Sequence, residues 1–188
     1  TAFDAIETIE DLAKDEWRGR ICTRPGSHVY NRALMASLIA AHGAQAAESW
    51  ARDFVANLAR KPQGNDRAQA KAISQGICDV AIMNSYYYGK MKFSDDADQR
   101  LWADSLRLIF TNQKDRGNHI NISGAGIAKH SPNKKEALAF LEFLTGEVAQ
   151  QLYGTINYEH PVNPAVAPPA GLASWGAFKR DELPIERL

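Results

Sequence analysis

Apolar side chains recur every three or four residues along several stretches of the chain, which is the pattern of helices that bury one face. Leu34 and Leu38 show this spacing in the first stretch, and Trp50 and Phe54 show it in the second. The pattern predicts helices over residues 30–42, 45–60, 66–76, 96–105, 131–145 and 147–153. Asp66 is expected to cap the third helix, because an aspartate side chain readily accepts from free N–H groups at a helix start.

Short apolar runs lie between these helices and predict strands over residues 20–23, 77–83, 106–110 and 122–128. Strands that alternate with helices indicate an α/β fold with a mainly parallel sheet flanked by helices. Such sheets place binding sites where strands end and loops lead into helices. Two loops have this position, Thr23–Tyr30 and Asn84–Gly89, and both contain tyrosine.

Composition narrows the class of protein further. Hydrophobic residues make up 45% and charged residues 23%, as in an ordinary folded domain, which excludes global disorder. The 22 basic and 22 acidic residues balance, so no net charge would attract nucleic acid or an acidic membrane. No run approaches the roughly 18 apolar residues of a membrane span.

The run Asn84–Gly89 holds three consecutive tyrosines, which fit a simple core poorly. Where the backbone turns at a strand end, neighbouring side chains can converge on one point. A phenol keeps its proton near neutral pH because its pKa is about 10, but a hard trivalent cation can replace that proton. Tyrosinate is an iron ligand, so the run suits Fe³⁺. Packing at the rim of the sheet and a sugar-stacking surface are the alternatives.

The second loop precedes a predicted helix and supplies another tyrosine, Tyr30. Helix N-termini present free N–H groups and a positive partial charge, so they attract anions, including a phenolate. Ser27 has the alternative role of a simple N-cap, and His28 alone is weak evidence for a ligand.

Cys22 and Cys78 each lie at the edge of a short apolar run. If the two runs are neighbouring strands, a disulfide is geometrically reasonable. Two buried thiols are the alternative, because free cysteine packs as a small hydrophobic side chain. These residues alone leave both possibilities open.

Five blocks of sequence resemble the ferric-ion-binding proteins of bacterial ABC importers, which have the type II solute-binding fold. They match in order and span essentially the whole chain, at residues 22–31, 60–69, 84–87, 121–125 and 162–164. The resemblance implies a non-enzymatic protein, periplasmic or lipid-anchored outside the cytoplasm, that delivers Fe³⁺ to an inner-membrane ABC permease. It also implies a type II lobe with a mainly parallel sheet.

The resemblance also implies roles for individual residues. Tyr30, Tyr86 and Tyr87 would bind iron, and Tyr88 would pack beside them. Carbonate or another synergistic anion would be held by, or lie near, Arg24, Ser27, His28, Asn65 and Asn84. The oxidising compartment of the family favours a disulfide between Cys22 and Cys78.

Members of this family are two-lobed, and the resemblance implies that most of the first lobe is missing from this chain. Residues 1–118 would form the second lobe with the tyrosine site, residues 119–168 would return to the first lobe, and residues 169–188 would return to the second. The missing lobe often supplies a further His or Tyr ligand, so iron binding is expected to be weaker than in a complete relative. Exposed apolar area would favour self-association.

Two other functions remain as alternatives. A protein of the same fold could bind a small organic anion without metal, with the tyrosines stacking and donating hydrogen bonds. A mononuclear iron enzyme would be expected to show two histidines and a carboxylate with open positions, and no such triad is evident. Colour with iron would distinguish a tyrosinate site from a binder of organic anions.

Overall fold

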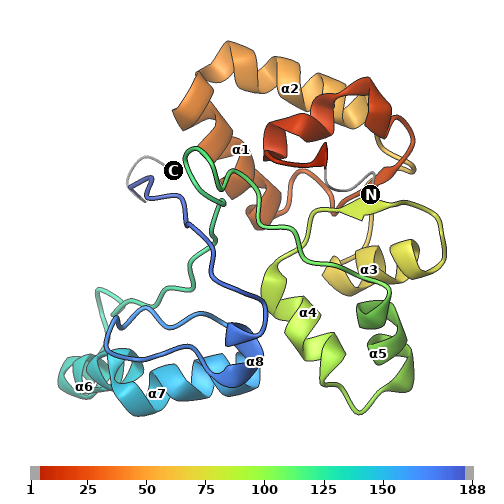
Figure 1. Cartoon of the computed structure of the whole chain (residues 1–188). Coiled ribbons are helices and arrows are strands. Elements are labelled where there is room, and N and C mark those ends of the chain that lie inside the picture. The colour runs from red at the N-terminus through yellow and green to blue at the C-terminus, as the bar shows by residue number, and fades with distance from the viewer. Residues whose placement is uncertain (1–4, 185–188) are drawn as a thin grey trace.

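The computed structural model describes residues 5–184 and consists largely of helices around a small parallel sheet (Figure 1). The α-helices are α1 (Val29–His42), α2 (Ala44–Ala56), α3 (Asp66–Ser74), α4 (Ser85–Lys92), α5 (Ala97–Asp104), α6 (Lys134–Thr145), α7 (Glu147–Leu152) and α8 (Ala170–Ala173). Shorter turns are η2 (Ile9–Ala13), η3 (Asp15–Trp17) and the π-helical η4 (Tyr153–Asn157). The segments predicted for the two ends of the chain include residues 1–4 and 185–188, which lie outside the described residues.

The sheet is a pair of parallel strands, β1 (Ile21–Cys22) and β2 (Val80–Ala81), with Ile21 opposite Val80. The parallel arrangement is confirmed, but both strands are shorter than predicted. The strands predicted over residues 106–110 and 122–128 are wrong, since neither segment is a strand in the structure. Among the described residues neither joins a strand ladder, and an apolar run without such a partner stays irregular.

Predicted helices are confirmed as elements, with corrections at their bounds: the second ends at Ala56 and the third at Ser74. The helix predicted from residue 96 begins at Ala97, with Asp96 as its N-cap. The helix expected from Ser131 begins instead at Lys134, after Asn133. The third is capped by Asn65, whose side-chain oxygen accepts from the Ala68 N–H at 3.1 Å, and not by Asp66. The Asp66 carboxylate is therefore free for other contacts.

Several small buried clusters hold the helices in place. Trp17, Ile21 and Phe54 join the N-terminal turns to β1 and α2. A second cluster of Ala70, Met91 and Ala103 packs α3, α4 and α5 against one another. This second cluster fixes α4, which carries the tyrosine run, against two neighbouring helices.

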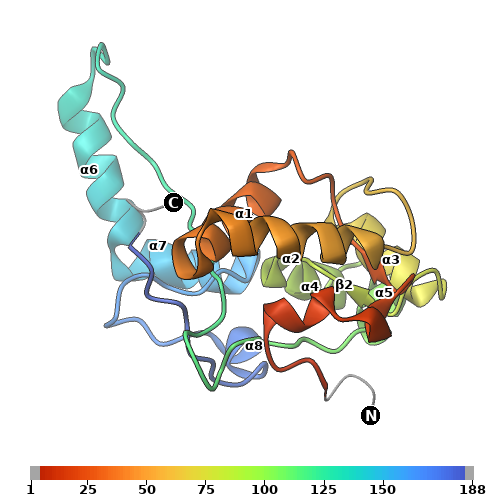
Figure 2. The ribbon, with the colours of Figure 1, turned by 90° about the horizontal axis from the view of Figure 1, so that it is seen from above.

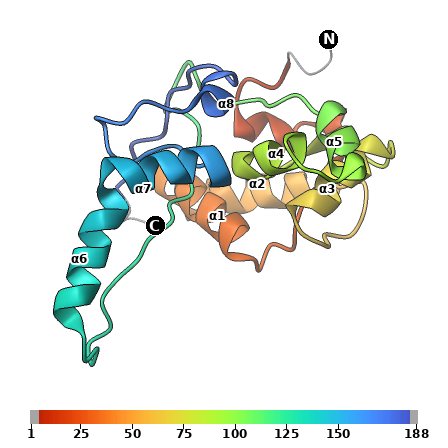
Figure 3. The same cartoon turned by 90° about the horizontal axis from the view of Figure 1, so that it is seen from below.

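The segment with α6 and α7 lies beside the body formed by α1 to α5, and α6 projects away from it (Figures 2 and 3). No residue of α6 is buried, and Leu138, Phe140 and Phe143 are each at least half exposed. An aromatic cluster connects this segment to α4: the Tyr158 ring stacks on Phe93 at 5.4 Å. A Cβ on Gly89 would lie 2.3 Å from Cγ of Tyr158, so only glycine permits this close approach.

Cys22 and Cys78 form a disulfide, with their Cα atoms 5.9 Å apart and both residues buried. The bond ties β1 to the turn that leads into β2. Among residues 5–184, no helix is both long enough and apolar enough to cross a membrane.

Replacing both cysteines with alanine is expected to lower the free energy of unfolding by about 4 kcal/mol, because the bond closes a long loop in the unfolded chain. The two cysteines are 56 positions apart in the sequence. Urea unfolding followed by circular dichroism measures the change. Equal stability of the parent and the double variant would contradict the expectation.

Candidate metal site

The tyrosine run begins a helix and does not form a loop, which corrects the prediction for Asn84–Gly89. β2 ends at Ala81, and α4 starts at Ser85 with Asn84 in the N-cap position. The turn of the helix, not the end of a strand, therefore sets the directions of these side chains. The rings of Tyr86 and Tyr87 nevertheless stack, with centroids 4.3 Å apart.

Tyr30 reaches the same place from the first turn of α1. Its hydroxyl oxygen lies 3.1 Å from the hydroxyl oxygen of Tyr86. Two helix N-termini therefore bring three phenols together, and the positive end of each helix dipole favours negative charge there. The structure thus gathers the tyrosines that the sequence predicted as ligands.

A cationic side chain faces each of the three rings. Arg24 lies over Tyr30 at 5.0 Å, Arg67 over Tyr87 at 5.1 Å and Lys90 over Tyr86 at 5.5 Å from the ring centroids. Sequence reasoning missed Arg67 and Lys90. They lie one helical turn or less from predicted site residues, but this spacing alone did not distinguish them from solvated surface charges.

Burial and the hydrogen bonds with Tyr30 and Tyr87 raise the pKa of the Tyr86 phenol above its ordinary value, and the charges of those two neighbours add to the rise. The hydroxyl of Tyr86 is therefore protonated near neutral pH in the absence of a metal. A cation that binds there must displace this proton.

Arg24 is held at the centre of the site. Its Nη1 donates to Oδ2 of Asp66, its Nη2 lies 2.8 Å from Nε2 of His28, and only 12% of its side chain is exposed. Although burial disfavours the charged form, Asp66 and Tyr87 raise the pKa of the Arg24 guanidinium. Arg24 is thus a fixed positive charge beside the phenols.

The structure corrects the alternative in which Ser27 is the N-cap of the first predicted helix. His28, not Ser27, occupies the N-cap of α1, and its Nδ1 accepts from the Tyr30 N–H at 3.3 Å. A neutral imidazole has one acceptor nitrogen, so the contacts with Tyr30 and Arg24 compete for it. Ser27 is exposed.

Asn84 faces the site, whereas Asn65 is engaged elsewhere. The backbone N–H of Asn84 donates to Oδ1 of Asp66 at 2.8 Å, and its Oδ1 accepts from Asn121 at 2.8 Å. Its Nδ2 is buried without a hydrogen-bond partner among the described residues. Asn65 is exposed, and its side-chain oxygen caps α3.

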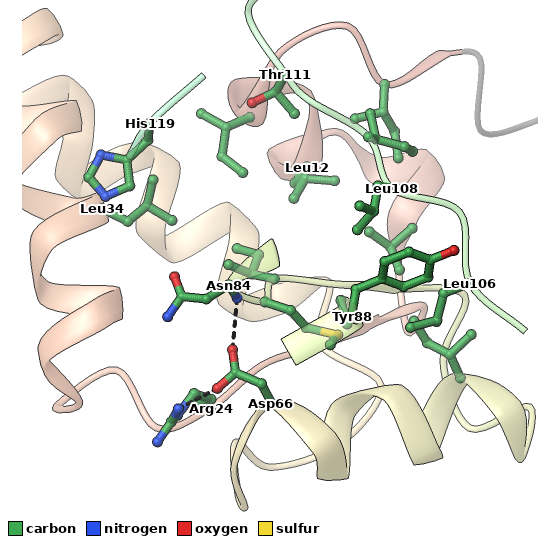
Figure 4. A pocket seen from close by; sticks show the side chains of 18 of the residues that line it. Leu12, Arg24, Leu34, Asp66, Asn84, Tyr88, Leu106, Leu108, Thr111 and His119 are labelled. Atoms are coloured by element: carbon green, nitrogen blue, oxygen red, sulfur yellow. Dashed lines mark hydrogen bonds and ion pairs between the residues drawn. The ribbon is translucent and has the colours of Figure 1, made fainter. Parts of the chain in front are cut away.

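A cavity of about 380 Å³ lies beside these groups, and Arg24, Asp66, Asn84 and His119 line its polar part (Figure 4). Leucine side chains line much of the rest. Burial lowers the pKa of His119, and its Nε2 has no hydrogen-bond partner within the described part of the chain. His119 and Asp66 are site residues that sequence reasoning missed, because neither stands in a ligand motif.

Residues 5–184 contain no group of three or more His, Cys, Asp or Glu side chains that could hold a metal ion. Phenolate oxygen is a hard donor, which favours a hard cation over Cu⁺ or Zn²⁺.

Residues 7–176 match the model of a family described as bacterial extracellular solute-binding protein, and the chain belongs to that family. The family consists of binding proteins, not enzymes, as the sequence predicted.

The curated relatives that match this chain include two iron uptake proteins. The chain is 42% identical over 185 residues to iron uptake protein A1 of Synechocystis and 46% identical over 186 residues to iron uptake protein A2 of the same organism. These alignments cover 98% and 97% of this chain but 51% and 54% of the relatives. The chain thus spans about half the length of the curated relatives it matches.

Solved structures of similar proteins superpose closely on this chain. The ferric binding protein of Campylobacter jejuni aligns with a TM-score of 0.95 at 37% identity, covering 98% of this chain and 58% of that chain. A Trichodesmium protein solved in complex with iron and citrate ligands aligns with a TM-score of 0.91 at 44% identity, covering 95% and 56%. The predicted resemblance and the type II solute-binding fold are confirmed.

Proposed function

We propose that this chain binds Fe³⁺ as cargo through the phenolate oxygens of Tyr30, Tyr86 and Tyr87. The observation that carries the proposal is the 3.1 Å approach of the Tyr30 and Tyr86 hydroxyls, with the Tyr87 ring stacked on Tyr86. A metal ion that replaces both phenolic protons turns this close pair into two ligands of one cation. Names of relatives such as iron uptake protein A2 support iron as the cation.

We also propose that an anion completes the coordination. Three phenolates balance the charge of Fe³⁺. Asp66 pairs with Arg24, so Arg67 and Lys90 leave the positive excess around the phenols. The Nε of Arg24 and the Nδ2 of Asn84 are buried donors without partners among the described residues. Carbonate or a carboxylate such as citrate fits these donors, and the Trichodesmium complex with iron and citrate ligands supports this class of anion.

The proposed setting is the periplasm or the outer face of a membrane, with delivery of the iron to an ABC permease. A Serratia marcescens relative, 28% identical over 162 residues, is named Fe(3+)-binding periplasmic protein. The Cys22–Cys78 disulfide supports an oxidising compartment. The chain binds and releases its cargo without covalent chemistry.

The division into lobes stays a proposal: residues 1–118 and 169–188 in the second lobe, and residues 119–168 in the first. The projection of α6 away from α1 to α5 supports a separate body for the middle segment. The exposed side chains of α6 are the surface that the predicted self-association would use. Sedimentation of the apo chain at several concentrations tests that prediction.

Competition for ferric citrate tests the function directly. The purified chain is equilibrated with ferric citrate, separated by gel filtration and analysed for metal. We expect one iron per chain, retained at citrate concentrations that strip iron from bovine serum albumin. In parallel, calorimetry with phosphonates, sulfonates and organic acids in iron-free buffer tests the alternative. Tight binding of one of these anions, with no retention of iron, would overturn the proposal in favour of an organic-anion binder.

A further inference from the structure

We propose that Asp66 is a positioning residue that fixes the geometry of the tyrosine site, acting through Arg24 and the start of α4. This inference rests on the proposed iron binding at Tyr30, Tyr86 and Tyr87. Asp66 touches none of the three phenols in the described contacts, so its role is to hold the groups that carry or face them.

The Asp66 carboxylate is buried, with 1% of its side chain exposed, and each of its oxygens has a different partner. Oδ1 accepts a hydrogen bond from the backbone N–H of Asn84, with 2.8 Å between nitrogen and oxygen. Oδ2 accepts one from Nη1 of Arg24. Figure 4 shows both interactions at the polar part of the cavity. A buried carboxylate is costly unless it is paired and hydrogen-bonded, and these two contacts provide the pairing.

Helix formation does not require this carboxylate. Asn65 already caps α3, and Asp66 is the first residue of that helix. Its two bonds instead reach 18 positions forward to Asn84 and 42 positions back to Arg24. One side chain thus joins the three loops that lead into α1, α3 and α4.

These links determine where the phenols lie. Asn84 is the N-cap of α4, two positions before Tyr86, so its backbone N–H sets where the tyrosine helix begins. Arg24 lies over the Tyr30 ring at 5.0 Å. Asp66 therefore holds one group that lies over the Tyr30 ring and one that begins the helix of Tyr86, and the hydroxyls of these two tyrosines lie 3.1 Å apart.

Asp66→Asn tests the link with almost no change of shape. Its amide oxygen can still accept from Asn84, but its NH₂ cannot accept from Arg24. We expect Fe³⁺ affinity to fall about 10- to 100-fold, the range seen for residues that orient metal ligands. We also expect the visible tyrosinate–iron band to move, because the phenolate geometry relaxes. Asp66→Glu keeps the charge with a longer side chain and should give a smaller loss and a smaller shift.

Asp181→Asn is the matched control. Asp181 forms a comparable ion pair with Arg116, with 12% and 18% of the side chains exposed, at the opposite end of α1 near Ala41 and His42. This variant should lose stability while its iron affinity and its visible band stay those of the parent. Thermal unfolding of every variant is measured, and iron is titrated below the lowest midpoint.

One result would overturn the role of Asp66, and a different result would overturn iron binding by the tyrosines. If Asp66→Asn and Asp66→Glu lose only stability and keep the parent's affinity and band, Asp66 is structural and the inference is wrong. If Tyr86→Phe in the same experiment also keeps the parent's affinity, the tyrosine site itself is wrong. Loss of affinity with a shifted band in the Asp66 variants, and an unchanged band in Asp181→Asn, supports the positioning role.

Discussion

Replacing Tyr86 or Tyr87 with phenylalanine is expected to weaken Fe³⁺ binding at least about 100-fold, because each change removes a phenolate oxygen from the metal. Even residues that only orient a ligand typically cost 10- to 100-fold. Phenylalanine keeps the ring, so the 4.3 Å stacking of the two side chains and the fold should persist. The double variant should bind no iron in competition with citrate.

Tyr88→Phe is the matched control for this experiment, since it removes a hydroxyl from the next residue of the same helix. The Tyr88 ring meets Trp175 edge to face at 5.7 Å and packs on the cluster of α3, α4 and α5. We expect its iron affinity to equal that of the parent. Equal affinities for the parent, Tyr86→Phe and Tyr87→Phe would show that the run does not bind the metal.

Iron binding is expected to collapse in acid, by up to about 1000-fold in affinity for free Fe³⁺ per pH unit. Each phenol that becomes a ligand gives up a proton, and each such proton contributes a tenfold change per pH unit below the phenol pKa of about 10. The raised pKa of Tyr86 extends this dependence upward in pH. Iron affinity falls as the pH falls, because the apo site holds the protons and the iron-loaded site does not. Acid therefore favours the apo form.

Calorimetry in two buffers with different ionisation enthalpies counts the protons released per iron. We expect close to three for the parent, after correction for the protonation of the chelator, and close to two for Tyr30→Phe if that variant still binds iron. Release of no protons by the parent would mean that the phenols do not hold the ion, and that neutral groups or carboxylates already free of protons do so instead. The same count in Tyr88→Phe as in the parent serves as the control.

Helices were predictable from the sequence because each has a periodic apolar face or a clear stop, as α1 does at Gly43. The tyrosine helix was not, since Tyr86, Tyr87 and Tyr88 give no helical alternation and come soon after the strand predicted over residues 77–83. The strand predicted over residues 106–110 failed for a different reason. An apolar run forms a strand only beside another backbone edge, and its own sequence does not supply that edge.

The site was predictable only in part. Hard oxygen donors in two loops indicated an iron site, and the resemblance to ferric-ion-binding proteins assigned it to Tyr30, Tyr86 and Tyr87, which the structure brings together. Asp66 escaped notice because its position suggested a helix cap, and the choice between Asn65 and Asp66 as cap depends on backbone geometry. Contacts such as Arg67 over Tyr87 arise from how α3 and α4 pack together, which no local pattern encodes.

A visible-absorbance titration of the purified chain with ferric ion tests the central claim most directly. Phenolate bound to Fe³⁺ absorbs visible light by charge transfer, whereas neutral phenol and most other iron ligands of proteins do not give this band. We predict a band that grows to saturation at one equivalent of iron and is absent from the Tyr86→Phe, Tyr87→Phe double variant. A folded parent chain that stays colourless with iron, or a band of equal strength in the double variant, would contradict binding of Fe³⁺ by these tyrosines.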